Sequence, residues 1–95
     1  MIKHIVMFKL KNKNKENIEK IVSALKTLEG NIDVLRSAEV GVNFTKSERS
    51  YDIVLTTEFD DHNALNAYGP HPNHLPVVET VRSLCSGSIV VDYET

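Results

Sequence analysis

The sequence predicts an α+β domain whose elements follow in the order β-α-β-β-α-β. Three stretches have the two-residue period expected of strands, and a fourth, near the C-terminus, is rich in isoleucine and valine. The stretches between the first and second strands, and between the third and fourth, instead repeat apolar residues every three or four positions. The chain has 95 residues, so we expect one domain covering residues 1–95.

The first strand is expected at residues 2–10, where one face carries Ile2, His4, Val6, Phe8 and Leu10. Residues 11–15 are a polar loop, and Asn14 or Asn17 is expected to cap the following helix. The helix is expected over residues 16–28, with an apolar stripe made of Ile18, Ile21, Val22, Leu25 and Leu28. Gly30 is expected to end it.

The second and third strands are expected at residues 34–44 and 51–59, joined by the polar connection 45–50. Both segments alternate, and their closeness in sequence predicts a hairpin. On this pattern Asp52 lies on the opposite face to Tyr51 and Ile53, either paired across the sheet or exposed.

Two helical segments and a last strand complete the chain. Asp60 or Asp61 is expected to cap a short helix that continues through Tyr68, after which Gly69 and Pro70 break it. A further helix is expected from His74 to about Leu84, capped by Asn73 and tolerating Pro76 in its first turn. Residues 86–93 are expected to form the fourth strand.

This order is the ferredoxin-like arrangement, in which one four-stranded antiparallel sheet carries the helices on one face. The predicted strands are apolar on both faces, so a monomer would leave a sizeable apolar patch on the other side of the sheet. We therefore expect a homodimer formed by sheet-to-sheet packing.

Composition excludes several classes of function. The net charge is -2, which argues against a nucleic-acid binder. Met1 leads directly into the first strand and no stretch is long and apolar enough to span a membrane, so we expect a cytoplasmic protein with no membrane partner. Cys85 is the only cysteine, which rules out an internal disulfide and any zinc pattern of cysteines. No glycine-rich phosphate loop is present, and no cofactor is expected.

The chain resembles the stress-responsive A/B barrel (Dabb) family along nearly its whole length. The resemblance rests on "IKHIVMFKLK", "AEVGVN", "YDIVLTTEF", "LNAYGPHPNHLPVVETV" and "IVVDYE", taken together. It implies a dimeric α+β barrel in which two sheets close around or beside a cavity. Most members of the family have no known activity.

More distantly, the chain resembles a plant member of that family, olivetolic acid cyclase, which cyclises a linear polyketide by an aldol reaction. The resemblance implies a catalytic pair at Tyr68 and His74, with the first-strand histidine of the cyclase falling at His4. Asp52 stands where the cyclase has a third histidine, which is a departure from its pattern.

The chemistry of these residue types agrees with that pair. His74 lies near a predicted helix N-terminus, where the helix dipole disfavours a positive charge and favours a neutral imidazole that accepts a proton. Tyr68 is suited to donate a hydrogen bond to a carbonyl oxygen that gains negative charge. The alternative is architectural: His74 bonds to a backbone carbonyl and holds its loop, and Tyr68 packs on the core and bonds to His74.

Two further histidines are candidate substrate-binding groups. His4 alternates with apolar residues and is expected to point towards the core, where it is either a ligand contact or a satisfied core histidine. His71 lies in the turn between Pro70 and Pro72, where it either binds a ligand or belongs to the turn. His71 and His74 are a weak metal pattern with no further ligand nearby, and no metal is expected.

Two functions from different classes follow. The first is a cofactor-independent enzyme or binding protein for a small organic molecule, with cyclase, lyase or monooxygenase-like chemistry and a β-keto substrate favoured. The second is a non-enzymatic, stress-related structural dimer. A pocket that reaches both Tyr68 and His74 favours the first, and a packed site without a void favours the second.

Overall fold

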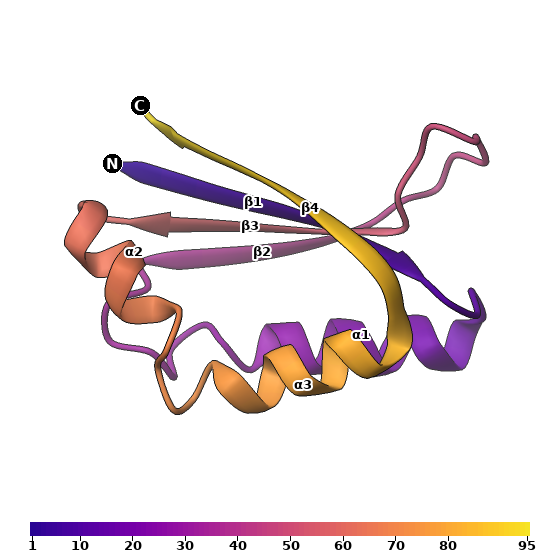
Figure 1. Cartoon of the computed structure of the whole chain (residues 1–95), viewed down its shortest axis with the longest axis horizontal. Coiled ribbons are helices and arrows are strands. Elements are labelled where there is room, and N and C mark those ends of the chain that lie inside the picture. The colour runs from indigo at the N-terminus through magenta and orange to yellow at the C-terminus, as the bar shows by residue number, and fades with distance from the viewer.

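The computed structural model describes all 95 residues and has the predicted ferredoxin-like α+β architecture. Its elements are β1 (Ile2–Leu10), α1 (Lys15–Lys26), β2 (Ser37–Val42), β3 (Ile53–Phe59), α2 (His62–Tyr68), α3 (Leu75–Leu84) and β4 (Cys85–Glu94). The four strands form one antiparallel sheet in the order β2-β3-β1-β4. Figure 1 shows α1 and α3 side by side along one face of this sheet, with α2 at one end.

The register of the sheet decides which side chains share the helix-covered face. His4 is the direct partner of Asp92 on β4 and of Thr57 on β3, so these residues lie on the same face. The ladder between β1 and β4 shifts between Lys9 and Leu10, where the extra residue is a β-bulge or local irregularity. The other face of β1 carries Ile5 and Met7.

The structure shows which residue caps each helix. The side chain of Asn14 accepts a hydrogen bond from the backbone N–H of Asn17, so Asn14 is the cap of α1. Asp61 does the same for Ala64 at the start of α2. The prediction that Asn73 caps α3 is wrong: His74 occupies the cap position, and the Asn73 side-chain amide instead donates to the carbonyl of Asn31.

Several element boundaries also differ from the prediction. The second strand begins at Ser37 instead of Val34, because the chain first makes a turn in which the Leu35 N–H donates to the Ile32 carbonyl. It ends at Val42. The first helix ends at Lys26, and the turns after it close at Gly30, whose φ of +80° lies in the region that favours glycine. The last strand starts one residue early, at Cys85.

The third strand is also shorter than predicted, because Tyr51 and Asp52 precede it. Asp52 is buried and accepts a hydrogen bond from the Leu10 N–H at 2.8 Å. Its carboxylate also lies 3.3 Å from the ammonium of Lys13. Asp52 therefore ties the end of β1 to the start of β3.

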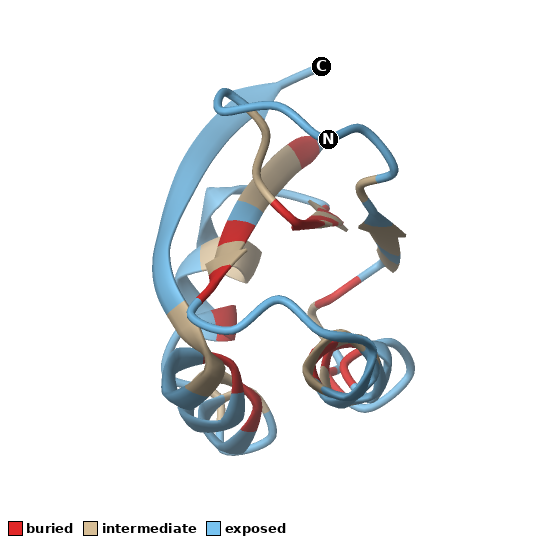
Figure 2. Cartoon of the chain, turned by 90° about the vertical axis from the view of Figure 1, so that its right-hand side faces the viewer, coloured by how far each residue is buried: buried red, intermediate tan, exposed pale blue.

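The core lies between the sheet and the helices, as the buried residues in Figure 2 show. It contains Ile2, Phe8, Leu10, Ile21, Leu25, Leu28, Ile32, Leu35, Ile53, Leu55, Phe59, Tyr68, Val77 and Val81. In contrast, β4 is exposed along almost its whole length. Its residues Ile89, Val91 and Tyr93 share the uncovered face of the sheet with Met7. No helix has the length and apolar character needed to cross a membrane.

Candidate functional site

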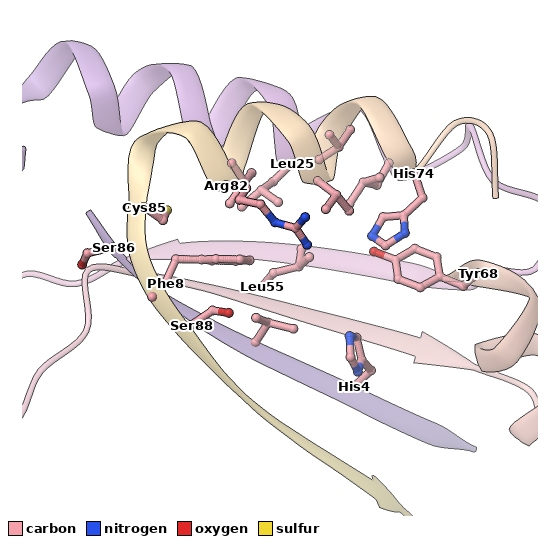
Figure 3. A pocket seen from close by; sticks show the side chains of 16 residues that line it. His4, Phe8, Leu25, Leu55, Tyr68, His74, Arg82, Cys85, Ser86 and Ser88 are labelled. Atoms are coloured by element: carbon pink, nitrogen blue, oxygen red, sulfur yellow. The ribbon is translucent and has the colours of Figure 1, made fainter. Parts of the chain in front are cut away.

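A cavity of about 390 Å³ lies between the sheet and α3. Its apolar wall combines residues of β1, β3, both long helices and the turn after α1, namely Val6, Phe8, Leu25, Leu28, Leu55, Val77, Val78 and Val81. Polar side chains reach it from β1, α2, α3 and β4, and Figure 3 shows them arranged around the same space. A concave apolar site with a few convergent polar groups is the usual form of a small-molecule site.

Tyr68, at the C-terminal end of α2, is buried with only 2% of its surface exposed. Its ring packs on Phe59 with centroids 4.9 Å apart and stacks on His74 at 4.1 Å. The hydroxyl of Tyr68 has no hydrogen-bond partner in the protein. Since no fully buried side-chain nitrogen or oxygen lacks a partner, this hydroxyl is not fully buried and is open to the cavity. Burial raises the pKa of Tyr68 to about 12, so the phenol stays protonated and available as a donor.

His74 is positioned by the turn that separates α2 from α3. The His71 N–H donates to the Tyr68 carbonyl and the His74 N–H donates to the His71 carbonyl, which brings the His74 ring back over Tyr68. Nδ1 of His74 lies 2.9 Å from the carbonyl oxygen of Gly69. A carbonyl only accepts hydrogen bonds, so the proton of the neutral ring is on Nδ1 and the lone pair is on Nε2.

His4 projects from β1 into the same cavity, as the alternation predicts. Its ring meets the edge of Tyr68 with centroids 6.1 Å apart. Nδ1 of His4 forms a short hydrogen bond with the carboxylate of Asp92. Asp92 is a site residue that sequence reasoning missed, because its position opposite His4 depends on the register between strands at opposite ends of the chain.

Arg82 and Ser88 also line the cavity and were not predicted. Arg82 follows Val78 by four residues and continues one edge of the apolar stripe of α3, but it is exposed, so the sequence alone does not separate it from a solvated helix residue. Ser88 gave no sequence signal that separates it from a solvent-exposed strand residue.

His71, the other candidate substrate-binding residue, does not line this cavity. Its Nδ1 accepts a hydrogen bond from the Asn73 N–H at 3.0 Å, and its Nε2 lies 3.6 Å from the carboxylate of Asp33. The turn that directs His74 into the cavity therefore leaves His71 outside it, in contact with Asn73 and Asp33. No group of three or more histidine, cysteine or acidic side chains is placed to hold a metal ion.

Cys85 lies on the cavity wall at the start of β4. Burial raises the pKa of its thiol, and the negative charge of Asp52 raises it further against an opposing effect of Lys11. The thiol form is thereby favoured over the nucleophilic thiolate. The cavity therefore offers proton-transfer and hydrogen-bonding groups, with no activated cysteine among them.

The chain is similar to proteins of one domain family and to solved structures with the same fold. The stress responsive A/B barrel domain matches residues 2–95. The chain is 32% identical over 97 residues to an uncharacterised protein of Streptomyces coelicolor, with 99% of each chain covered. A dimeric protein of unknown function with a ferredoxin-like fold from Bacteroides fragilis is 30% identical, with a TM-score of 0.83 and coverage of 99% of this chain and 95% of that one. A dimeric ferredoxin-like protein from Thermobifida fusca is 21% identical, with a TM-score of 0.87 and coverage of 99% and 90%.

Proposed function

We propose that this chain, which belongs to the stress-responsive A/B barrel domain family, binds a β-keto compound in its cavity and catalyses proton abstraction followed by cyclisation. The observation that carries the proposal is the tautomer of His74. Its Nδ1 is engaged by Gly69, which leaves the basic Nε2 free beside a protonated phenol in an apolar cavity.

The reaction needs only these groups. Nε2 of His74 takes a proton from the carbon between two carbonyl groups, and the C–H electron pair forms the C=C bond of an enolate. The electron pair displaced from the carbonyl moves onto its oxygen, where the hydroxyl of Tyr68 donates a hydrogen bond. The enolate carbon then attacks a second carbonyl carbon of the same molecule, and the resulting alkoxide takes the proton back from His74.

His4 completes the polar end of the cavity as a substrate contact. Its bond to Asp92 fixes the orientation of the imidazole, as the third group does in other histidine-containing catalytic sites. Because Asp92 engages Nδ1, Nε2 of His4 is the nitrogen left to contact a ligand.

A homodimer is part of the proposal. The uncovered face of the sheet exposes the apolar residues Met7, Ile89, Val91 and Tyr93. Related proteins from Bacteroides fragilis and Thermobifida fusca with the same fold are dimeric, which supports a second copy as the cover of this face. Sheet-to-sheet packing would remove these side chains from water.

A neutral β-keto ester, ethyl 3-oxohexanoate, tests the chemistry. We expect the protein to accelerate deuterium exchange at its C2 methylene in D₂O, followed by ¹H NMR. Replacing His74 by Gln keeps a donor for Gly69 and removes the base, so exchange should slow about 100-fold or more. Tyr68→Phe should slow it by a similar order of magnitude because the oxyanion loses its donor.

His62→Gln is the matched control, since His62 is an exposed histidine at the start of α2 that lies outside the cavity. It should exchange the ester at the wild-type rate. The competing function is a structural dimer, which the bond between His74 and Gly69 also favours. That reading is correct if the wild-type protein does not exceed the buffer rate while His74→Ala and Tyr68→Phe both lower the unfolding midpoint.

A further inference from the structure

We propose that the preferred ligand of this cavity carries a carboxylate that pairs with Arg82, so that an apolar-chain keto acid binds more tightly than a neutral ketone of the same length. The inference rests on the proposed function and specifies its substrate. Arg82 is an exposed residue of α3 whose side chain contributes to the wall of the cavity.

The guanidinium of Arg82 has no partner in the protein. The ion pairs of the chain join Lys13 to Asp52, Lys20 to Glu16, Arg36 to Asp60, His4 to Asp92 and His71 to Asp33. Arg82 takes part in none of them, although Glu79 lies one turn earlier on the same helix. Arg36 shows the contrast, because its guanidinium is engaged by both carboxylate oxygens of Asp60.

The local charges leave Arg82 as the free cation of the cavity. No acidic side chain lines the cavity, and Asp92, which contacts the lining residue His4, is already bonded to it. Lys11, which lies near Cys85 at the other end, donates to the carbonyl of Ser83. Anions entering the cavity therefore meet an unpaired guanidinium and no unpaired carboxylate.

The direction of the Arg82 side chain fits a ligand that also reaches the catalytic pair. His74 and Arg82 are eight residues apart, so their backbones are separated by about 12 Å along the helix axis. Side chains on a helix lean towards its N-terminus, and Figure 3 shows the guanidinium extending along α3 towards His74, into the space between helix and sheet. A carboxylate held there places the next few carbon atoms of the ligand towards His74 and Tyr68.

Ser88 supplies a second donor for the same group. Figure 3 shows its hydroxyl directed towards the cavity from β4, on the side opposite α3. A carboxylate takes two parallel hydrogen bonds from a guanidinium, which a neutral hydroxyl does not. A phosphate monoester can form the same pair, but its second negative charge makes it costlier to remove from water into a cavity with an apolar wall. The cavity volume of about 390 Å³ holds roughly a dozen non-hydrogen atoms, if each occupies about the 30 Å³ of a water molecule.

Octanoate is the probe, with 1-octanol and octyl phosphate as neutral and phosphate-bearing analogues of the same chain length. Isothermal titration calorimetry on the wild-type protein should show octanoate binding at least tenfold more tightly than either analogue. Arg82→Gln should weaken octanoate binding about 10- to 100-fold, as expected for loss of a charge-assisted pair. Arg82→Lys should recover part of the loss, because it keeps the charge without the planar fork.

Arg49→Gln is the matched control, since Arg49 lies in the connection between β2 and β3, away from the cavity. It should bind octanoate as the wild type does. Equal binding of octanoate and 1-octanol, tighter binding of octyl phosphate, or no difference between Arg82→Gln and Arg49→Gln would each overturn the inference, as would an absence of octanoate binding. The exchange of ethyl 3-oxohexanoate, which has no carboxylate, reports on the proposed function separately.

Discussion

Raising the pH above 10 should destabilise the wild-type protein more than a Tyr68→Phe variant. The phenol of Tyr68 lies against Phe59 and under the ring of His74, where an oxyanion is poorly solvated. Burial therefore raises its pKa from 10.0 to about 12. The substitution keeps the packed ring and removes the only group whose ionisation is in question.

The magnitude follows from the two pKa values. Below pH 10 the phenol is neutral in the folded and unfolded states, so the stability associated with this group is fully present. Between pH 10 and 12 the unfolded chain loses the proton first, and the free energy of unfolding falls by about 1.4 kcal/mol at pH 11. Above pH 12 both states are ionised, and the accumulated loss is roughly 3 kcal/mol.

Urea unfolding followed by far-UV circular dichroism at pH 8, 10 and 11 measures this loss. With a urea dependence of about 1–3 kcal/mol/M, the wild-type midpoint should fall by roughly 0.5–1.4 M more than the variant midpoint between pH 8 and 11. Tyr51 and Tyr93 are present in both proteins, so their contributions cancel in the comparison. Parallel pH profiles for the two proteins would refute the reasoning, because they would mean that the Tyr68 hydroxyl ionises as it does in water.

Two further predictions concern the scaffold. Asp52→Ala should lower the free energy of unfolding by about 1–3 kcal/mol, because the buried N–H of Leu10 loses its acceptor. Lys13→Ala should lower it by less than about 1 kcal/mol, because it removes only an ion pair with a partly exposed lysine. Thermal unfolding of both variants measures these changes, and equal effects would contradict the prediction. Val91→Lys places a charge on the uncovered face of the sheet and should convert the dimer to a monomer, as measured by sedimentation velocity. Leu75→Lys, on the exposed side of the helical layer, should leave the dimer intact. A dimer that survives Val91→Lys would mean that the interface lies elsewhere.

Sequence reasoning was strongest where a pattern extends over many residues. The alternation of Ile2–Leu10 predicts β1 with its observed bounds, since every second side chain is committed to the core. It overestimated β2, because Val34 and Leu35 continue the alternation although they lie in a turn. Leu35 is buried there by the approach of the chain to the core, a contact that local periodicity does not encode.

In the candidate site too, some residues follow from the sequence pattern and others depend on the tertiary structure. Tyr68, His74 and His4 could be proposed from residue type, spacing and family resemblance, and the structure brings all three to one cavity. Asp92 depends on how β4 aligns with β1 across nearly the whole chain length, and Arg82 on the direction of one flexible side chain. His71 was a candidate on the same grounds, but it lies outside the cavity, because the short turn between α2 and α3 directs only one of its two histidines inwards.

The exposure of β4 links the cavity to the state of assembly. This strand carries Asp92 and Ser88 towards the cavity on one face and Val91 towards the open face of the sheet on the other. A second copy that packs on the open face would hold the strand and thereby restrict the cavity wall. Where the restricted wall is the form that binds the ligand, ligand affinity rises with protein concentration, and by reciprocity a bound ligand strengthens dimerisation by the same factor.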